Sequence, residues 1–383
     1  MLKAKDYENE VILQAKIRRA TTEFINIIND LWYDKSIELV LFRNTLVDKR
    51  ASEILNLINY AKEFVGKPIS VYDALDIAKA IQHVQLPSSK LDIGKLAYEC
   101  YLDVNGSEDK VTFVKKQLKD ATEAKDIQPK DVVLYGFGRI GRLLARELMS
   151  KMGKGSQLRL RAIVTRGEIT KNVLDKRASL LSIDSVHGDF LGTVQTDVEN
   201  NALIINGTTV TMISAKSPEE IDYTKYGIQD ALVIDNTGAF RDKEALNMVI
   251  TETGAGKAVS KALPSLKGKL TSNAIRVPVP NGSLAILHLK LGTEITTEAV
   301  NSIMKLNALE GDLVEQIQYS LDAELVSSDI VGSTAPSIFD SKATITHGDS
   351  IVIYVWYDNE YGYSHQVIRL AKYIAKVRRY TYY

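Results

Sequence analysis

The sequence contains very little cysteine, since Cys100 is the single one in 383 residues, and a disulfide within the chain is therefore excluded. An excess of charge is also lacking, because 48 basic residues balance 48 acidic ones. This balance gives no reason to expect nucleic acid or an anionic membrane as a partner. No apolar run is long enough to cross a bilayer, and the polar first nine residues do not resemble a secretion signal. We expect a cytoplasmic protein, because so little cysteine is typical of a reducing compartment.

Groups of metal ligands are missing as well. The chain has five histidines and one cysteine, and none of them stands with other ligand-type residues at the spacing of a metal site. We therefore expect no metal, and the chemistry has to be sought in other motifs.

The length of 383 residues exceeds one ordinary core and predicts two or three domains. Residues 1–128 have apolar side chains at helical spacing, for example from Phe24 to Leu31. Ser70 followed by Asp73 resembles a capping box that opens a further helix. This region predicts an all-helical extension with a role in packing or assembly.

From residue 129 the pattern changes to short strand-like runs that alternate with helical stretches. The runs before residue 250 are 131–135, 158–164, 202–205 and 231–234. Such alternation predicts a parallel sheet covered by helices, and so an α/β fold. We assign 129–249 to a Rossmann-type dinucleotide-binding domain, which a C-terminal helix within 357–383 joins. Residues 250–356 then form a separate α+β substrate domain.

The sharpest motif is a glycine loop, Gly136-Phe-Gly138-Arg-Ile-Gly141, which directly follows the strand-like run 131–135 and precedes a helical pattern. Gly136 permits a tight turn, Gly138 lets the backbone approach a pyrophosphate, and Gly141 lets helix and strand pack closely. The N–H groups of the first helical turn would face the phosphates. A glycine-rich turn without any ligand is the alternative, and the strand–loop–helix context disfavours it.

The strand-like run 158–164 bears on the choice of cofactor, because its end lies beside the adenosine ribose in such folds. NAD-binding sites usually carry Asp or Glu there, whereas this sequence continues with Thr165 and Arg166 and has no acid before Glu168. Arg166 is suited to a ribose 2′-phosphate. The sequence therefore predicts NAD or NADP as the cofactor. A solvated Arg166 without a ligand is the alternative that it leaves open.

Five further segments occur in the order typical of glyceraldehyde-3-phosphate dehydrogenases: 184–188 (DSVHG), 236–240 (NTGAF), 253–259 (TGAGKAV), 273–278 (NAIRVP) and 356–364 (WYDNEYGYS). With the glycine loop, the sequence resembles this family from about residue 130 to 383. Residues 1–128 resemble the extension of a longer bacterial subgroup. The resemblance also implies a homo-oligomer.

The resemblance implies roles for individual residues. Those expected along the dinucleotide are Phe137, Gly138, Arg139, Ile140, Thr237 and Gly238. Asn359 would hydrogen-bond the nicotinamide carboxamide, and Tyr363 would pack nearby. Thr253, Gly254 and Arg276 resemble the group that binds triose phosphate or inorganic phosphate. Alternatively, the first two simply begin a helix and the third is a surface residue of a strand.

The family reaction requires a cysteine thiolate and a histidine base. It is the phosphorylating oxidation of glyceraldehyde 3-phosphate to 1,3-bisphosphoglycerate in glycolysis or gluconeogenesis. The resemblance places both groups between the segments that match Phe240 and Thr253, where this chain has only residues 241–252. Cys100 lies outside every matched motif. We therefore assign no catalytic residue and expect a truncated substrate domain with unpaired sheet edges.

Three interpretations follow from the sequence. The chain is an NAD(P)-dependent enzyme of this lineage, an inactive cofactor-binding or assembly protein, or a deletion product of a longer active enzyme.

Overall fold

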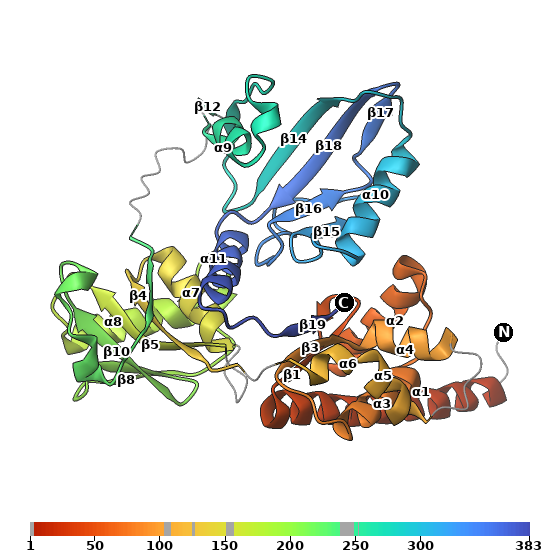
Figure 1. Ribbon diagram of the computed structural model, residues 1–383, viewed down its shortest axis with the longest axis horizontal. Helices are drawn as coiled ribbons and strands as arrows, with labels where there is room; N and C mark the ends of the chain where they lie inside the picture. The colour runs from red at the N-terminus through yellow and green to blue at the C-terminus, as the bar shows by residue number, and fades with distance from the viewer. Residues whose placement is uncertain (1–3, 103–108, 125–126, 151–156, 238–248, 252) are drawn as a thin grey trace.

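The computed structural model describes residues 4–102, 109–124, 127–150, 157–237, 249–251 and 253–383. These residues form an N-terminal module, a central α/β region and a C-terminal sheet region (Figure 1), each around its own apolar core. The mixed α/β fold class predicted from the sequence is confirmed. Within the described ranges, no helix combines the length and the apolar character that a bilayer crossing demands.

The N-terminal module is mainly helical. Its helices are α1 (Ala4–Lys35), α2 (Ala51–Tyr60) with a π-helical continuation (Ala61–Val65), α3 (Val71–Gln82), α4 (Ile93–Leu102), α5 (Lys110–Gln117) and α6 (Lys119–Thr122). Phe24 and Leu31 of α1 are fully buried, as their spacing predicts. The predicted capping box is also present: the Ser70 hydroxyl accepts from the Asp73 N–H at 3.3 Å, and the Asp73 carboxylate accepts from the Ser70 N–H at 2.7 Å.

The prediction that this module is all-helical is wrong in one respect, because it contains a small sheet. The strands are β1 (Ile37–Leu41), β2 (Asn44–Thr45) and β3 (Ser89–Asp92), and the order is β19-β3-β1-β2. All five residues of β1 are buried, and a short apolar run of this kind cannot be told from a helical segment by periodicity. The fourth strand, β19 (Tyr380–Tyr382), comes from the far end of the chain and pairs parallel with β3.

The central region is a Rossmann-like sheet with the order β11-β4-β5-β10-β9-β8. Its strands are β4 (Lys130–Tyr135), β5 (Leu158–Thr165), β8 (Val194–Asp197), β9 (Ala202–Ile205), β10 (Thr208–Ser214) and β11 (Leu232–Asp235). The pairs β11–β4, β4–β5 and β5–β10 are parallel. Helices α7 (Arg139–Ser150) and α8 (Lys171–Ser182) follow β4 and β5, and the short pair β6 (Ile183–Asp184) and β7 (Gly188–Asp189) follows α8.

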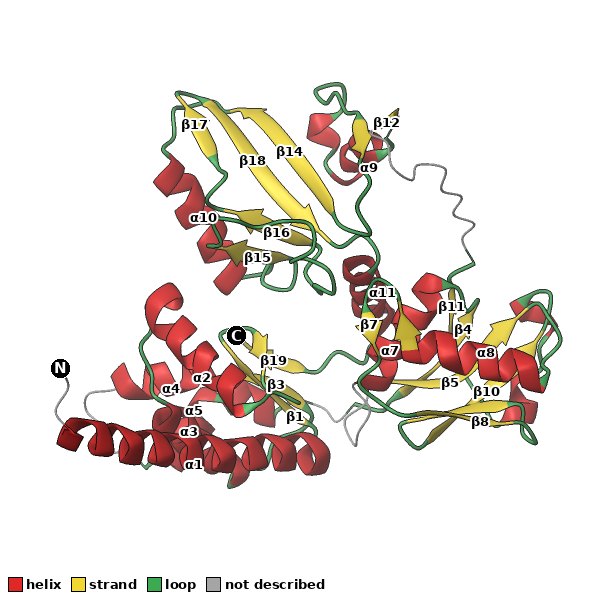
Figure 2. Cartoon of the chain, turned by 180° about the vertical axis from the view of Figure 1, so that it is seen from behind, coloured by secondary structure: helices red, strands yellow, loops and turns green. Residues whose placement is uncertain are grey.

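The C-terminal region is built on a mostly antiparallel sheet, β14-β18-β16-β15, with β17 also paired to β18. Its elements are β12 (Val249–Thr251), α9 (Ala255–Ala262), β13 (Ala274–Arg276), β14 (Ser283–Lys290), α10 (Thr297–Leu309), β15 (Ile317–Ser320), β16 (Ser337–Asp340), β17 (Ile345–His347) and β18 (Ser350–Tyr357). Val300 of α10 packs with Phe339 and Ile353 of the sheet. Strands β12 and β13 form a separate two-stranded sheet, and Figure 2 shows β12 and α9 outside the larger sheet.

Each of the two larger sheets has an edge strand with exposed residues. Among the described residues, β11 pairs only with β4, and β14 pairs only with β18. On β14, the side chains of Ile286 and Leu287 are 50% and 42% exposed. Exposed apolar side chains along an edge strand are a recognised cause of aggregation.

The C-terminal helix is shorter than the predicted 357–383 segment. Helix α11 (Tyr361–Ile374) packs against α7, and its Ile368 and Ala371 belong to the core of the α/β region. The chain then turns at Lys376, which has a φ of 55°, and continues into β19. The sequence pattern could not predict this strand, because residues 380–382 become a strand only through their pairing with β3.

The junction between α11 and β19 carries an ion pair that should stabilise the N-terminal module. Arg379 contacts Glu38 at 2.6 Å, with both side chains more than nine-tenths buried, and its guanidinium lies 5.1 Å from the Trp32 ring centre. We expect Arg379→Ala to lower the free energy of unfolding of this module by about 3 kcal/mol, because it leaves a buried carboxylate without its closest cation. Urea denaturation followed by tryptophan fluorescence measures this loss.

The neighbouring Arg378 provides the control. Its side chain is 56% exposed and lies 3.8 Å from Glu315, so Arg378→Ala should cost less than about 1 kcal/mol. Equal losses in the two variants would contradict the assigned role of Arg379.

Candidate functional site

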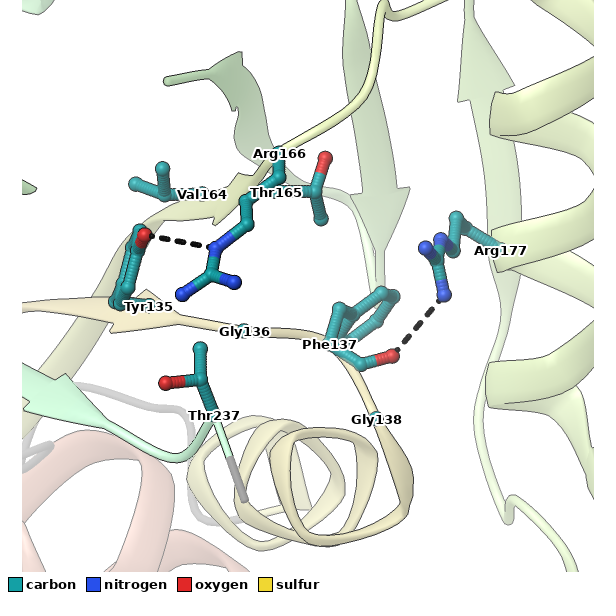
Figure 3. A pocket seen from close by; sticks show the side chains of 9 residues that line it. All are labelled: Tyr135, Gly136, Phe137, Gly138, Val164, Thr165, Arg166, Arg177 and Thr237. Atoms are coloured by element: carbon teal, nitrogen blue, oxygen red, sulfur yellow. Dashed lines mark hydrogen bonds between the residues drawn. The ribbon is translucent and has the colours of Figure 1, made fainter. Parts of the chain in front are cut away.

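A pocket of about 380 Å³ opens at the carboxyl ends of β4, β5 and β11 (Figure 3). In this sheet the chain passes from β4 to β5 on one side and returns to β11 on the other, so the strand order reverses at β4. Ligands of open α/β sheets bind at such a reversal, outside the carboxyl ends of the strands. The residues that line the pocket are Tyr135, Gly136, Phe137, Gly138, Val164, Thr165, Arg166, Arg177 and Thr237.

The glycine loop has the geometry that its sequence predicts. Gly136 has a φ of 102°, a conformation that L side chains rarely adopt. A Cβ on Gly141 would lie 2.6 Å from the Gly136 carbonyl oxygen and 2.6 Å from Oδ1 of Asn236. Helix α7 can therefore approach the strand ends this closely only because residue 141 has no side chain. A Cβ on Gly138 would meet no atom within 4 Å. The backbone at Gly138 is therefore open to a ligand.

Helix α7 begins directly at this opening. The Gly138 carbonyl accepts from the Arg142 N–H at 3.0 Å, which closes the first helical turn. The N–H groups before Arg142 have no partner within the helix and form a binding position for an anion. A pyrophosphate fits this arrangement, because it brings negative charge and hydrogen-bond acceptors.

Two arginines border the pocket, and none of the nine lining residues is acidic. Nε of Arg166 donates to the Tyr135 hydroxyl at 3.3 Å, and this contact raises the pKa of Arg166. On another side of the loop, Nη1 of Arg177 donates to the Phe137 carbonyl at 3.2 Å. Burial, and then repulsion from Arg142, lowers the pKa of Arg177. A bound anion would relieve this repulsion.

The third strand end is ordered by Asp235, which is not among the residues that line the pocket. The Asp235 carboxylate accepts from the Thr237 N–H at 2.9 Å and from the Thr237 hydroxyl at 2.7 Å. These hydrogen bonds lower the pKa of Asp235. They hold Thr237 at the pocket wall.

The structure gathers six of the residues predicted to bind a cofactor around this pocket: Gly136, Phe137, Gly138, Thr165, Arg166 and Thr237. Arg139, Ile140 and Gly141 lie in the first turn of α7. Gly238 falls outside the described residues. Sequence reasoning missed Tyr135, Val164 and Arg177. The first two end the predicted strands and adjacency would have found them, whereas no local motif marks Arg177 on α8.

Asn359 and Tyr363 lie at the start of α11 and do not line the pocket. Both side chains are exposed. The next residue to Asn359, Glu360, accepts from Nη1 of Arg139 at 2.7 Å. This ion pair places Asn359 near the first turn of α7, beside the opening described above.

The three residues predicted to bind phosphate lie in or next to the β12–β13 pair. Arg276 lies opposite Val249 in the β12–β13 pair, whereas Thr253 and Gly254 follow the other end of β12. The Thr253 hydroxyl accepts from the Ala255 N–H at 3.1 Å, as at the start of a helix. A phosphate-binding role for this group stays a prediction.

The fold and the pocket together define a Rossmann-type dinucleotide-binding protein. Comparison with known proteins makes this more specific. Residues 130–243 match the model of the glyceraldehyde 3-phosphate dehydrogenase NAD binding domain, and residues 198–359 match the C-terminal domain of the same enzymes. The chain belongs to the glyceraldehyde-3-phosphate dehydrogenase family, and a pyridine nucleotide is the cofactor that this domain indicates.

Individual relatives support the assignment. A glyceraldehyde-3-phosphate dehydrogenase-like protein of Pseudomonas aeruginosa is 35% identical, over 92% of this chain and 98% of its own length. Enzymes named glyceraldehyde-3-phosphate dehydrogenase from Trichormus variabilis and Bacillus subtilis are each 28% identical, over 64% of this chain and 98% of their own lengths. Because the match to the Pseudomonas protein takes in 92% of the chain, it includes most of the N-terminal module.

The alignments also show that part of these relatives has no counterpart here. The alignment with the Pseudomonas protein has 457 positions but takes in 92% of 383 residues, or about 352, so about 105 positions lack a residue of this chain. The alignment with the Bacillus enzyme has 343 positions and takes in 64%, or about 245 residues, which leaves about 98. The two gaps have nearly the same size.

The glycine loop allows a test that separates ligand approach from packing. We expect Gly138→Ala to leave the Tm nearly unchanged and to weaken nucleotide binding at least about tenfold, because the new methyl group occupies the space that a phosphate has to enter. Gly141→Ala should instead destabilise the fold by about 1–3 kcal/mol through overpacking. Calorimetric titration with NADH and thermal unfolding measure the two effects, and a large loss of stability in Gly138→Ala would argue against an open loop.

Proposed function

We propose that this chain binds a pyridine nucleotide at the glycine loop and does not catalyse the phosphorylating oxidation of glyceraldehyde 3-phosphate to 1,3-bisphosphoglycerate. The observation that carries the first half is the pocket around Gly136, Gly138, Arg166 and Thr237. It combines an open backbone, the start of a twelve-residue helix and two arginines. The bound nucleotide would supply the hydride acceptor of the family reaction.

The second half of the proposal rests on the position of the thiol. Cys100 lies on α4 and packs against the core of the N-terminal module. No cysteine or histidine is among the residues that line the pocket. Acyl transfer through a thiolate requires the nucleophile, its base and the nicotinamide to lie together. The roughly 100 alignment positions without a counterpart agree with the loss of the segment that the resemblance expects to carry the cysteine and the histidine.

For the cofactor, we propose NADP(H), or equal use of NAD(H) and NADP(H). Thr165 at the end of β5 brings no negative charge to the ribose, and Arg166 next to it faces the pocket (Figure 3). The hydrogen bond to Tyr135 holds this guanidinium over the pocket. A ribose 2′-phosphate would gain a charge-assisted hydrogen bond there.

The nucleotide preference is measured by titration. We expect NADPH to bind at least as tightly as NADH, and we expect Arg166→Gln to weaken NADPH about tenfold while NADH changes little, because only the 2′-phosphate contacts this arginine. Lys171→Gln, a change of the same charge at the start of α8 outside the pocket, is the control. A preference for NADH of about 100-fold in the wild-type chain would refute this assignment of Arg166.

The catalytic half is measured by steady-state turnover with glyceraldehyde 3-phosphate, phosphate and each nucleotide. We expect no rate above background in a protein that binds the nucleotide, because a nucleophile beside the ring is lacking. Turnover that persists in Cys100→Ser would overturn this part of the proposal and leave nucleotide binding unaffected.

A second candidate is favoured by the alignment gap: the chain is a deletion product of a longer active enzyme. The intact mass of the protein purified from its natural source distinguishes the two, because the sequence corresponds to 42.5 kDa and the longer enzyme would be heavier by the missing segment. Otherwise, we propose a cofactor-binding protein whose N-terminal module serves in assembly, in a cytoplasmic homo-oligomer. The supports are the single cysteine, typical of a reducing compartment, and the family resemblance.

A further inference from the structure

A buried group of four polar residues, Asp184, His187, Asn281 and Asp358, joins the NAD-binding part of the chain to the segment that carries Asn359. We refer to it as the His187 cluster. Asp184 ends β6 and His187 lies in the turn before β7. Asn281 precedes β14, and Asp358 lies between β18 and α11. The side chains of His187 and Asp358 are 2% and 0% exposed. A polar group so completely buried needs partners, and the cluster supplies them.

The imidazole of His187 lies between two carboxylates. Nδ1 is 3.3 Å from Oδ1 of Asp184, and Nε2 is 3.1 Å from Oδ2 of Asp358. A neutral imidazole donates from one nitrogen only, so its other nitrogen would present a lone pair to a carboxylate. The protonated ring donates to both. The geometry therefore favours the imidazolium form.

The remaining polar groups around the ring agree with this charge. The Asn281 amide lies 3.3 Å from Nε2 of His187 but donates to Asp358 at the shorter distance of 2.8 Å. Behind Asp184, Nη2 of Arg142 lies 3.5 Å from its carboxylate. The Tyr361 ring, 5.7 Å away, faces the imidazole from α11, and burial raises the pKa of its hydroxyl to about 12, so it is neutral.

Burial alone would lower the pKa of His187, but the hydrogen bonds and charges of Asp358 and Asp184 outweigh it and raise this pKa. Burial likewise opposes ionisation of Asp184, yet the N–H groups of His187 and Val186 and the imidazole lower its pKa to about 2. The pKa of Asp358 is lowered in the same way, against its burial, by His187 and by backbone N–H groups. The two carboxylates are therefore ionised near neutral pH, and both favour the protonated form of the His187 imidazole.

Asp358 transmits the position of His187 to the backbone around Asn359. One oxygen of Asp358 accepts from the N–H groups of Glu360 and Tyr361 at 2.9 and 2.8 Å, and the other accepts from the Gly332 N–H at 2.8 Å. In the sequence, Asn359 therefore stands between the buried Asp358 and the two residues whose N–H groups Asp358 accepts from, Glu360 and Tyr361. Its own side chain remains exposed, next to the Arg139–Glu360 ion pair at the first turn of α7.

We propose that His187 is a positioning residue: as an imidazolium it holds Asp358, and through Asp358 the backbone that directs Asn359 toward the nicotinamide end of the nucleotide. This inference rests on the proposed nucleotide binding. It separates the two ends of the ligand, because the pocket at Gly138 and Arg166 serves the adenosine diphosphate end and the His187 cluster serves the other end.

The experiment compares a complete nucleotide with one that lacks the nicotinamide. The full-length wild-type chain, His187→Gln and His83→Gln are titrated with NADH and ADP-ribose, and with NADPH and 2′-phospho-ADP-ribose. His83 is an exposed histidine at the end of α3 in the N-terminal module, so it controls for the chemical change. We expect His187→Gln to bind ADP-ribose like the wild type and NADH about tenfold more weakly. His83→Gln should behave like the wild type.

The pH dependence of nucleotide affinity is a second measurement, and a purely structural role of His187 would not change it. A raised pKa means that the contribution of the imidazolium is present below the ordinary pKa of histidine and is lost as pH rises through the raised value. The ratio of NADH to ADP-ribose affinity should therefore fall with rising pH in the wild type and stay constant in His187→Gln. The low pKa values of Asp184 and Asp358 mean that these carboxylates become protonated only at a pH far below the range in which His187 titrates.

Each outcome decides something. Equal weakening of NADH and ADP-ribose in His187→Gln, or no weakening of either, overturns the positioning role and leaves nucleotide binding intact. Failure of the folded wild type to bind either ligand overturns the proposed function itself. If His187→Gln does not fold, Asn281→Ala, which removes one donor to Asp358, should show the same loss selective for NADH, and a wild-type affinity ratio independent of pH would refute the inference.

Discussion

The close approach of α7 to the ends of β4 and β11 is the constraint on which the rest of the structure depends. Gly136 takes a backbone conformation open to glycine, and Gly141 leaves no room for a methyl group against Asn236. Because α7 starts at this point, its first N–H groups face the pocket, Arg139 reaches Glu360, and Arg142 reaches Asp184. A small displacement of the helix would loosen the pocket and both ion pairs together. The positions of the glycine loop and of the start of α11 therefore depend on each other.

The end of the chain ties all three regions together. Helix α11 follows the long strand β18 of the C-terminal sheet, contributes Ile368 and Ala371 to the α/β core, and leads to β19 in the N-terminal sheet. The N-terminal module is thus completed by residues nearly the whole chain away. Contacts over such sequence separation form late, since loop closure is costly before they are made.

The uncovered apolar surface has a simple physical origin. The two edge strands β11 and β14 stand on either side of the chain segment where the family resemblance expects more residues. Exposed side chains on β14, β12 and β13, such as Ile286, Ile250 and Ile275, would normally be buried against further structure. Under the proposal that a segment has been lost here, this segment would have covered the two edges.

The sequence by itself determined the glycine loop, the strand-like runs before and after it, and the helix spacing in residues 1–128. These depend on local requirements: glycine where a Cβ would collide, apolar alternation along a strand, and capping at Ser70. It could not show that Arg177 borders the pocket, that residues 380–382 form a strand with β3, or that His187 lies between two aspartates. Each of these contacts joins segments with no shared periodicity or motif. Only the packing of helices and sheets in three dimensions brings such residues within reach of one another.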